Sequence, residues 1–194
     1  MEIGPIDEEG QAIGRIESHG RPLNTTRKAS LDEIGVVALG SNLPGEFGSS
    51  RDLLDAAVAA LPGAGFDVAR ASRWWRASAW PEPTHPDYLN GVVLVETAME
   101  PEAAMEALKA VEARFGRVRT TPNAPRTLDL DLIALGRQVI ERPDLKLPHP
   151  RAHLRRFVMG PLAEIAPDWR HPVLGRTAHE LADAAEIGVD AAPE

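Results

Sequence analysis

An alternation of leucines and aspartates between Leu128 and Leu132 is the feature that most constrains what this chain can fold into. Side chains alternate between the two faces of a β-strand, so a strand here points its leucines toward a core and Asp129 and Asp131 to the other side. The Cα atoms of those two aspartates would lie about 6–7 Å apart. Carboxylates that close repel each other unless a cation lies between them. The stretch therefore predicts a strand with one buried face and one face of paired acids.

The chemistry of these two acids favours a hard cation. The chain contains no cysteine, so disulfides and thiolate metal sites are excluded. Carboxylate oxygens suit Mg²⁺, which commonly takes one or two carboxylates together with substrate phosphates. Arg126, just before the acids, has the guanidinium geometry that holds a phosphate in a bidentate fork. A solvent-exposed edge strand is the plainer alternative, and it is the more frequent explanation of such a run taken alone.

Length and composition indicate one globular domain. The chain has 194 residues, of which 43% are hydrophobic and 26% are charged, which is ordinary for such a domain. A net charge of −8 argues against a generic nucleic-acid binder. No apolar run is long enough to cross a membrane, and the acidic first residues do not resemble a signal peptide. We therefore expect a cytoplasmic protein without nucleic-acid or membrane partners.

The first 33 residues lack a sustained apolar period, which predicts a disordered N-terminal extension, with a docking tail as the alternative. A single domain is expected over residues 34–194. Within it, apolar periods and turn residues predict strands at 34–39, 66–76, 88–97 and 128–135, and helices at about 50–61 and 101–115. This β-α-β-β-α-β order is that of a ferredoxin-like α+β core, followed by a C-terminal extension with a short helix near residues 160–165.

Two predicted loops lead into the strands that carry the polar candidates. Three prolines between Ala77 and Asp87 forbid both helix and ladder, and a second loop covers residues 116–123. Arg117, Arg119 and Arg126 bracket the second loop and can gather around one polyphosphate. Arginines can bind phosphate oxygens and the neighbouring acids can bind metal ions, which is the combination that a magnesium–nucleotide site needs.

Further candidates are ambiguous when each is taken alone. His149 and Arg155 could donate to phosphate oxygens, but a lone histidine or arginine is more often an ordinary surface residue. Tyr88 and Asn90 offer a ring and an amide on one strand face, which suits a flat heteroaromatic ligand. Glu96 shares that face by alternation. Trp80 in the Pro-rich loop could cover such a ligand, although core packing is the usual role of tryptophan.

Five motifs occur in order along the chain. They are Ala38-Leu-Gly-Ser-Asn-Leu, Pro86-Asp-Tyr-Leu-Asn, Gly116-Arg-Val-Arg, Pro125-Arg-Thr-Leu-Asp-Leu-Asp-Leu and Leu147-Pro-His-Pro-Arg followed by Arg155-Arg-Phe-Val. With these motifs the chain strongly resembles the 6-hydroxymethyl-7,8-dihydropterin pyrophosphokinase family over roughly residues 34–175.

The resemblance implies transfer of pyrophosphate from ATP to the pterin hydroxymethyl group, with release of AMP, by an enzyme that is a monomer. It implies that two Mg²⁺ ions bind Asp129 and Asp131, and that the catalytic arginines are Arg117, Arg119 and Arg126. On the ATP side it implies Glu96, Leu132, Leu145, His149 and Arg155. For the pterin pocket it implies Tyr88, Asn90 and a stacking Phe157, to which we add Trp80 as a hypothesis.

Some residues depart from the family pattern. Asn123 stands where a tryptophan often closes over the pterin, and Pro150 replaces a frequent tyrosine. Ala77 and Ser78 replace a common Thr-Pro pair, and Trp80 replaces a smaller apolar residue. These departures concern loop closure and leave the acids in place.

Two other functions remain alternatives. A ferredoxin-like binding module without catalysis would have a basic, aromatic sheet face and no need for paired acids. Another magnesium-dependent nucleotidyl transferase would share the acids but release pyrophosphate, so formation of AMP separates it from the pyrophosphokinase.

Overall fold

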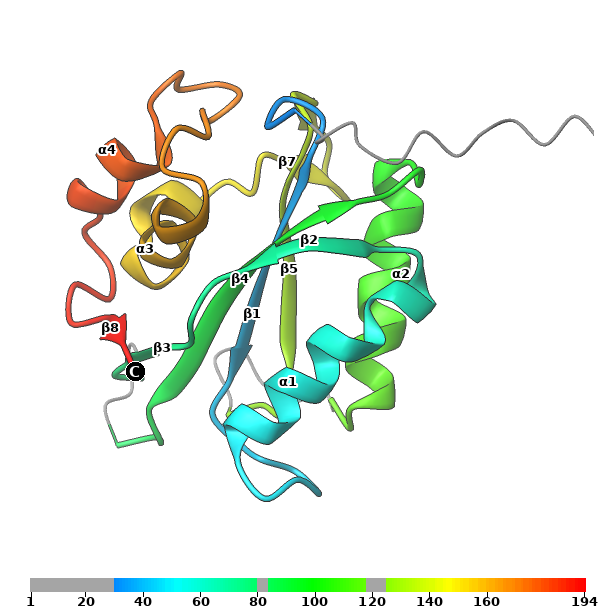
Figure 1. Ribbon diagram of the computed structural model, residues 1–194, viewed down its shortest axis with the longest axis vertical. Coiled ribbons are helices and arrows are strands. Elements are labelled where there is room, and N and C mark those ends of the chain that lie inside the picture. The colour runs from blue at the N-terminus through cyan, green and yellow to red at the C-terminus, as the bar shows by residue number, and fades with distance from the viewer. Residues whose placement is uncertain (1–29, 80–83, 118–124) are drawn as a thin grey trace, which may run out of the picture.

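The computed structural model describes residues 30–79, 84–117 and 125–194 (Figure 1). The strands are β1 (Gly35–Ser41), β2 (Asp67–Ala71), β3 (Trp75–Ala77), β4 (Tyr88–Glu96), β5 (Asp129–Leu135), β6 (Ile140–Glu141), β7 (Lys146–Leu147) and β8 (Ala192–Pro193). The α-helices are α1 (Ser50–Ala60), α2 (Pro101–Arg114), α3 (Arg156–Ile165) and α4 (Ala178–Asp183), and short 3₁₀ turns cover Pro62–Ala64 and Ala152–Leu154.

The main sheet is antiparallel throughout its described pairs. Its order is β5-β1-β4-β3-β8, and β2 also pairs with β4, while β6 and β7 form a separate small hairpin. Strand β1 thus lies between β4 and β5. This central position matters for the site, because residues of β1 separate the side chains of β4 from those of β5.

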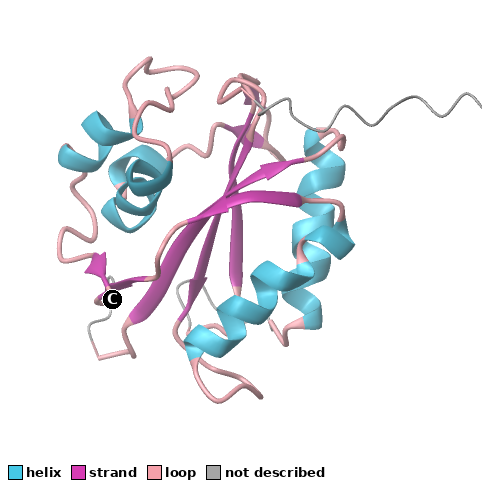
Figure 2. Cartoon of the chain, in the orientation of Figure 1, coloured by secondary structure: helices cyan, strands magenta, loops and turns pink. Residues whose placement is uncertain are grey.

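Helices cover the two faces of the sheet in separate layers (Figures 1 and 2). We call these the α1/α2 face and the α3/α4 face. On the first, the helices pack against alternate strand residues such as Leu39, Val93 and Leu130. On the second, the intervening residues such as Ala38, Val92 and Ile133 pack with residues of α3 and α4. The protein is therefore a mixed α/β structure with one antiparallel sheet between two helical layers.

Local signals explain where the first two helices begin and end. The Ser49 hydroxyl accepts a hydrogen bond from the backbone N–H of Asp52 at 3.1 Å and so caps α1. Helix α2 begins at Pro101, which has no backbone N–H to leave unsatisfied. It is followed by Gly116, whose positive φ of 75° is the conformation that commonly ends a helix.

The strand expected over residues 66–76 is instead two strands, β2 and β3, with a break at residues 72–74. Ser72 still exchanges hydrogen bonds with Val92, through its backbone N–H and its hydroxyl. Trp74 lies so close to Gly91 that a Cβ added to that glycine would be 2.5 Å from the indole ring. At this break the Trp74 ring packs against β4 in place of regular backbone pairing between the strands.

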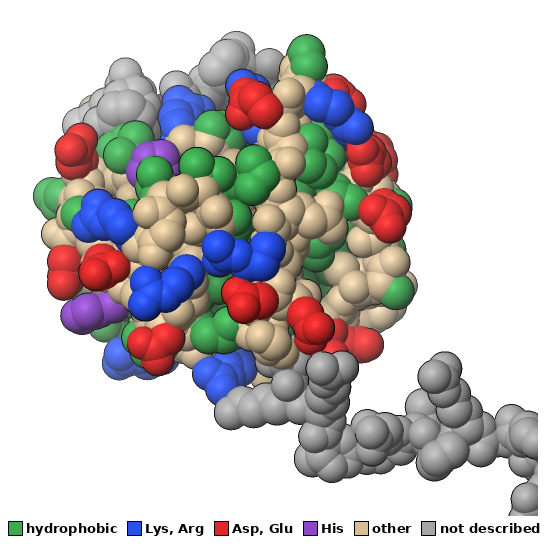
Figure 3. Space-filling view, turned by 90° about the horizontal axis from the view of Figure 1, so that it is seen from above, with side chains coloured by type: hydrophobic (Ala, Val, Ile, Leu, Met, Phe, Trp, Pro, Cys, Tyr) green, Lys and Arg blue, Asp and Glu red, His purple; other side chains and the backbone are tan. Residues whose placement is uncertain are grey.

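The C-terminal part contains more structure than the sequence predicted. Helix α3 begins at Arg156, four residues before the short helix expected near residues 160–165. The β6–β7 hairpin precedes α3, and α4 and β8 follow it. On the face of the molecule shown in Figure 3, basic and acidic side chains are interspersed among apolar ones. No helix in the described ranges is both long enough and apolar enough to cross a membrane.

Candidate active site

The alternation in β5 produces the two faces that it predicts. Leu128, Leu130 and Leu132 are buried in the core beneath α1 and α2. Asp129 and Asp131 lie on the α3/α4 face and keep 27% and 38% of their side-chain surface exposed. The backbone N–H of Leu130 donates to the Glu112 carboxylate of α2 at 2.8 Å, which ties the strand to the helix behind it.

Gly40 of β1 joins the acids to the polar residues of β4. It pairs with Asn90 on one side and with Asp129 on the other. A Cβ added to Gly40 would lie 3.2 Å from the Asn90 amide oxygen and 4.0 Å from both the Asp129 Cβ and the Tyr88 ring. Because glycine has no side chain, these three residues face one another across bare backbone.

Two arginines hold Asp129. Arg117 Nη1 donates to one carboxylate oxygen of Asp129, and also to the Leu128 carbonyl and the Glu112 carboxylate, each at 2.8 Å. Arg126 Nη1 donates to the other Asp129 oxygen at 2.7 Å. The Arg126 guanidinium also lies 5.8 Å from the centre of the Tyr88 ring, within range of a cation–π contact. This network connects the acids with an aromatic side chain of β4.

Asp131 has a different environment. Arg155 Nη1 lies 3.7 Å from its carboxylate, and the same guanidinium lies 5.7 Å from the centre of the Phe157 ring. Burial raises the pKa of Asp131, and the charge of Asp129 raises it further, while His149 and Arg155 oppose that change. The paired acids therefore repel each other as the sequence predicts, and arginines offset part of that repulsion.

His149 adjoins this second acid. Its backbone N–H donates to the Ile133 carbonyl of β5 at 2.8 Å, which anchors it beside the strand that carries Asp131. Burial lowers the pKa of His149, although Asp131 favours its protonated form. Its Nδ1 accepts a hydrogen bond from the Arg151 backbone at 3.3 Å. In the neutral ring the proton is therefore on Nε2, which can donate to an anionic ligand.

Three of the expected ATP-side residues lie apart from this cluster. Glu96 is at the opposite end of the nine-residue β4 from Tyr88, about 27 Å away by strand rise. Leu132 and Leu145 are only 3% and 6% exposed and lie in the core of the α1/α2 face, behind the strand from Asp131. Arg119, Trp80 and Asn123 lie outside the described residues.

Sequence reasoning missed two residues that shape the site. Glu112 is 3% exposed and accepts from both Arg117 and Leu130. The sequence does contain a sign of this role, because Glu112 is a charged residue one helical turn after Leu108, on the apolar side of α2. Asn42 is 4% exposed, and its amide accepts from the Arg126 backbone at 2.8 Å and donates to the Pro86 carbonyl at 3.1 Å. It joins the two segments that carry Arg126 and Tyr88, and it belongs to the first family motif.

The donor set fits magnesium bound together with phosphates. Among the described residues, no group of three or more His, Asp or Glu side chains is arranged to hold a metal ion by itself. Two neighbouring carboxylates with arginines around them fit an ion that takes few protein ligands and completes its shell with water and substrate oxygens. This arrangement of acids and arginines is typical of one class of protein, the enzymes that transfer a phosphate-containing group.

The chain belongs to the 7,8-dihydro-6-hydroxymethylpterin-pyrophosphokinase family, whose model matches residues 36–167. A relative from Synechocystis, a 2-amino-4-hydroxy-6-hydroxymethyldihydropteridine pyrophosphokinase, is 43% identical over 152 residues, which is 78% of this chain and 75% of that protein. A relative of the same name from Pseudomonas aeruginosa is 37% identical over 161 residues, or 81% of this chain and 95% of that protein. The family resemblance predicted from the motifs is thus confirmed.

Solved structures agree on the fold. A crystal structure of Plasmodium falciparum HPPK-DHPS with pteroate matches with a TM-score of 0.61 at 13% sequence identity, over 77% of this chain and 42% of that one. At that identity the likeness supports the fold alone. The chain spans less than half of that longer protein.

Proposed function

We propose that this site transfers the pyrophosphoryl group of ATP to the hydroxymethyl group of 6-hydroxymethyl-7,8-dihydropterin, giving AMP and the pterin diphosphate for folate biosynthesis. The family and its named relatives support the reaction. The observation that carries the assignment to residues is the position of Gly40 between two sets of candidates. Asp129, a candidate for the metal and phosphate side, lies across Gly40 from Asn90 and Tyr88, candidates for the pterin side.

Asp129 and Asp131 would hold the magnesium, which we propose to be two ions. Their separation on one strand face and their remaining exposure suit ligands that a substrate also shares. Bound magnesium neutralises charge on the polyphosphate. The chain itself holds the two carboxylates in place through ion pairs with Arg117, Arg126 and Arg155.

The same arginines are suited to the phosphates of ATP. Each guanidinium has five N–H donors in a fixed plane, so it can bind a carboxylate and a phosphate oxygen at once. Arg155 and the Nε2–H of His149 approach from the Asp131 side, and Arg117 and Arg126 from the Asp129 side. Arg119, beyond the described residues, is proposed to join them. Glu96, Leu132 and Leu145 do not line this cluster of charged side chains, and their place on the ATP side stays a prediction.

The pterin is proposed to lie against Tyr88, Asn90 and Phe157. The Asn90 amide is 6% exposed and faces the bare backbone of Gly40, where it can pair with a ring that has donors and acceptors. Phe157 is partly exposed and linked to the acids through Arg155, so its ring can stack on the pterin. Trp80 is proposed to cover the ligand from the Pro-rich loop.

Positioning carries most of the catalysis in this proposal. The hydroxymethyl oxygen attacks the β-phosphorus in line, and AMP leaves. Arginines aimed at the phosphates stabilise charge there, and the pocket holds the attacking oxygen in place, so both act without covalent participation of the protein. We assign no general base.

Finer structural expectations belong with this proposal. The order β5-β1-β4-β2, read through the pairing of β2 with β4, supports a ferredoxin-like core with a C-terminal extension. We also propose a single domain over residues 34–194 that acts as a monomer in the cytoplasm.

The test is a product assay with ATP, Mg²⁺ and 6-hydroxymethyl-7,8-dihydropterin, with nucleotides separated by chromatography. AMP and pterin diphosphate should form in equal amounts, and only when the pterin and Mg²⁺ are both present. Pyrophosphate as the released product would indicate a nucleotidyl transferase. An absence of nucleotide turnover by folded protein would overturn the proposal.

A further inference from the structure

The last nine residues, 186–194, form a non-helical segment with a turn at residues 189–190, which we call the strap. It follows α4, crosses beside α3 and ends in β8, which pairs with β3 at the edge of the main sheet (Figure 1). The strap lies beyond residues 36–167, which the family model matches. Its contacts fall on the segments proposed above to hold the pterin.

The first contact is with the segment that carries Arg155 and Phe157. The Arg156 backbone N–H donates to the Ile187 carbonyl at 2.8 Å, and the Ile187 N–H donates to the Leu154 carbonyl at 2.9 Å. Arg155 and Ile187 form a parallel β-bridge. The strap thus fixes the backbone on both sides of Arg155, immediately before Phe157.

The second contact is with the Phe157 ring itself. Gly188 has a φ of +65°, and a Cβ added there would lie 2.5 Å from Phe157 Cδ1 and 3.1 Å from Cε1. Ala191 packs in a small apolar cluster with Trp75 and Ala77, against which Phe157 also lies. One side of the aromatic ring therefore rests on a position where only glycine fits, and its orientation depends on that position.

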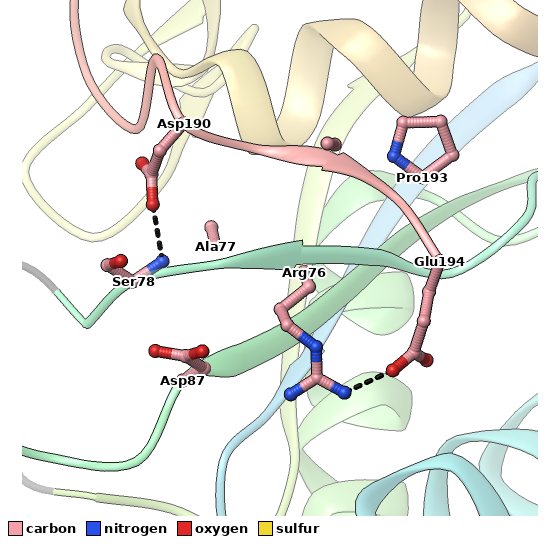
Figure 4. A pocket seen from close by; sticks show the side chains of 8 residues that line it. Arg76, Ala77, Ser78, Asp87, Asp190, Pro193 and Glu194 are labelled. Atoms are coloured by element: carbon pink, nitrogen blue, oxygen red, sulfur yellow. Dashed lines mark hydrogen bonds and ion pairs between the residues drawn. The ribbon is translucent and has the colours of Figure 1, made fainter.

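The third contact is with the start of the Pro-rich loop (Figure 4). Asp190 Oδ2 accepts a hydrogen bond from the Ser78 backbone N–H at 2.8 Å. Glu194 pairs with Arg76 of β3 and, at 2.6 Å, with Arg51 of α1. The strap and β3 line a pocket of about 300 Å³ together with Asp87, the neighbour of Tyr88. The strap thus holds the strand end from which the loop departs.

We propose that the strap is a positioning element of the pterin pocket: Gly188 sets the orientation of the Phe157 ring, and Asp190 fixes the start of the Pro-rich loop. This inference rests on the proposed function, because it assigns the strap to the pterin side of that site. It predicts that substitutions at Gly188 and Asp190, whose contacts are with Phe157 and Ser78, alter pterin recognition and leave ATP recognition in place.

The first experiment compares Gly188→Ala with Gly175→Ala. Gly175 has nearly the same φ, +67°, but no atom lies within 4 Å of its added Cβ. Both variants carry the same backbone strain, and only the first pushes on Phe157. We expect Gly188→Ala to raise the KM for the pterin about threefold to tenfold, which is the worth of one aromatic stacking contact. The KM for ATP should stay at the wild-type value in both variants.

The second experiment compares Asp190→Ala with Asp190→Asn, and it remains decisive if Gly188→Ala does not fold. Asp190 is exposed, so both variants should retain the fold. Asparagine keeps an oxygen that can accept the Ser78 N–H, whereas alanine does not. Asp190→Ala should raise the pterin KM, and Asp190→Asn should restore it.

The outcomes separate this inference from the proposed function. If the wild-type enzyme forms AMP but Gly188→Ala matches Gly175→Ala and Asp190→Ala matches the wild type, the strap has no positioning role. Equal increases in the KM for ATP and for the pterin would also overturn the inference, because they indicate general loosening. Titration of the fluorescent pterin into protein with Mg²⁺ and α,β-methylene-ATP, which cannot transfer pyrophosphate, applies the same comparison to binding. It therefore tests the strap even if the wild type produces no AMP.

Discussion

The two ends of the α3/α4 face of the sheet are both built from β1, β4 and β5, but one end is apolar and the other is polar. At one end, Val36, Leu94 and Ile133 are buried beneath α3 and α4. At the other end, the corresponding positions are Gly40, Asn90 and Asp129. Asn90 and Asp129 face each other across Gly40, and Asp129 also pairs with two arginines. The change takes place within a few residues of each strand. Apolar packing at the first end can therefore stabilise the strands that present repelling acids at the second.

The opposite face shows no such division in these strands. On the α1/α2 face, Leu39, Leu89 and Leu130 are buried directly behind the polar end. Leu130 is the chain neighbour of both Asp129 and Asp131. Stability and chemistry are thus separated by alternation along one strand, and substitution of neighbouring residues should affect one property and not the other.

The largest effect is expected from Asp131→Asn. Loss of this negative charge should lower the rate of AMP formation by roughly a thousandfold or more, since fixed charges at a reacting phosphate have effects of that order. Stability should change by less than about 1 kcal/mol, because the loss of the Arg155 ion pair is offset by relief of repulsion from Asp129. AMP assays at saturating Mg²⁺ and urea unfolding measure both. Near-normal turnover would refute a role of Asp131 in metal binding.

Leu130→Ala should have the reverse effect, with a large loss of stability and little loss of turnover. Removal of this buried side chain should lower the free energy of unfolding by about 2–5 kcal/mol through lost packing and a cavity. The backbone N–H that binds Glu112 remains, so folded molecules should keep most of their turnover. Urea unfolding checks the first expectation, and AMP assays at low temperature check the second. Leu174→Ala, at an exposed position, is the control and should change stability by less than about 0.5 kcal/mol.

Gly40→Ala tests the contact between the two parts of the site. The new Cβ would lie 3.2 Å from the Asn90 amide oxygen, so that amide must move by a few tenths of an ångström. A shift of that size should raise the KM for the pterin about threefold to tenfold, given the sensitivity of binding sites to misplacement. Thermal stability should be unchanged or higher, because alanine costs less chain entropy than glycine in a strand. Gly63→Ala, whose Cβ would meet nothing within 4 Å, should leave the KM unchanged.

The sequence predicted this arrangement where the information is local. The alternation over Leu128–Leu132 correctly assigned each side chain of β5 to its face, and the family motifs identified the reaction. Alternation gives the face of a residue but not its position along the sheet. Glu96 shares a strand face with Tyr88, yet it lies at the far end of β4, and its role on the ATP side stays a prediction.

What the sequence did not predict depends on contacts between distant segments. The role of Glu112 arises because α2 packs behind β5, 18 residues further along the chain. The strap meets the Phe157 segment through a bridge between residues 155 and 187. No local period encodes where α3 and α4 stop covering the sheet, and this limit decides which part of the face is left for the site.

The smallest effect concerns His171, which lies beside the covered end through its contact with Trp169. Burial, reinforced by His153 and Arg137, lowers the pKa of His171 from 6.5 to about 4. Its Nδ1 accepts two backbone N–H groups, from Val173 and Leu174, each at 3.2 Å. Both observations mean that the folded protein holds this ring neutral, whereas the unfolded chain protonates it near pH 6.5.

Between pH 6.5 and about 4 the unfolded state therefore binds more protons at this position than the folded state. His171 contributes stability that is fully present above pH 6.5 and is lost as the pH falls toward 4. Urea unfolding at pH 7.5 and pH 5.0 should show lower stability at pH 5.0, and His171→Asn should reduce that difference. Asparagine can still accept the two backbone N–H groups but cannot be protonated. An identical pH dependence in both proteins would show that protonation of His171 does not contribute to the loss of stability at acid pH.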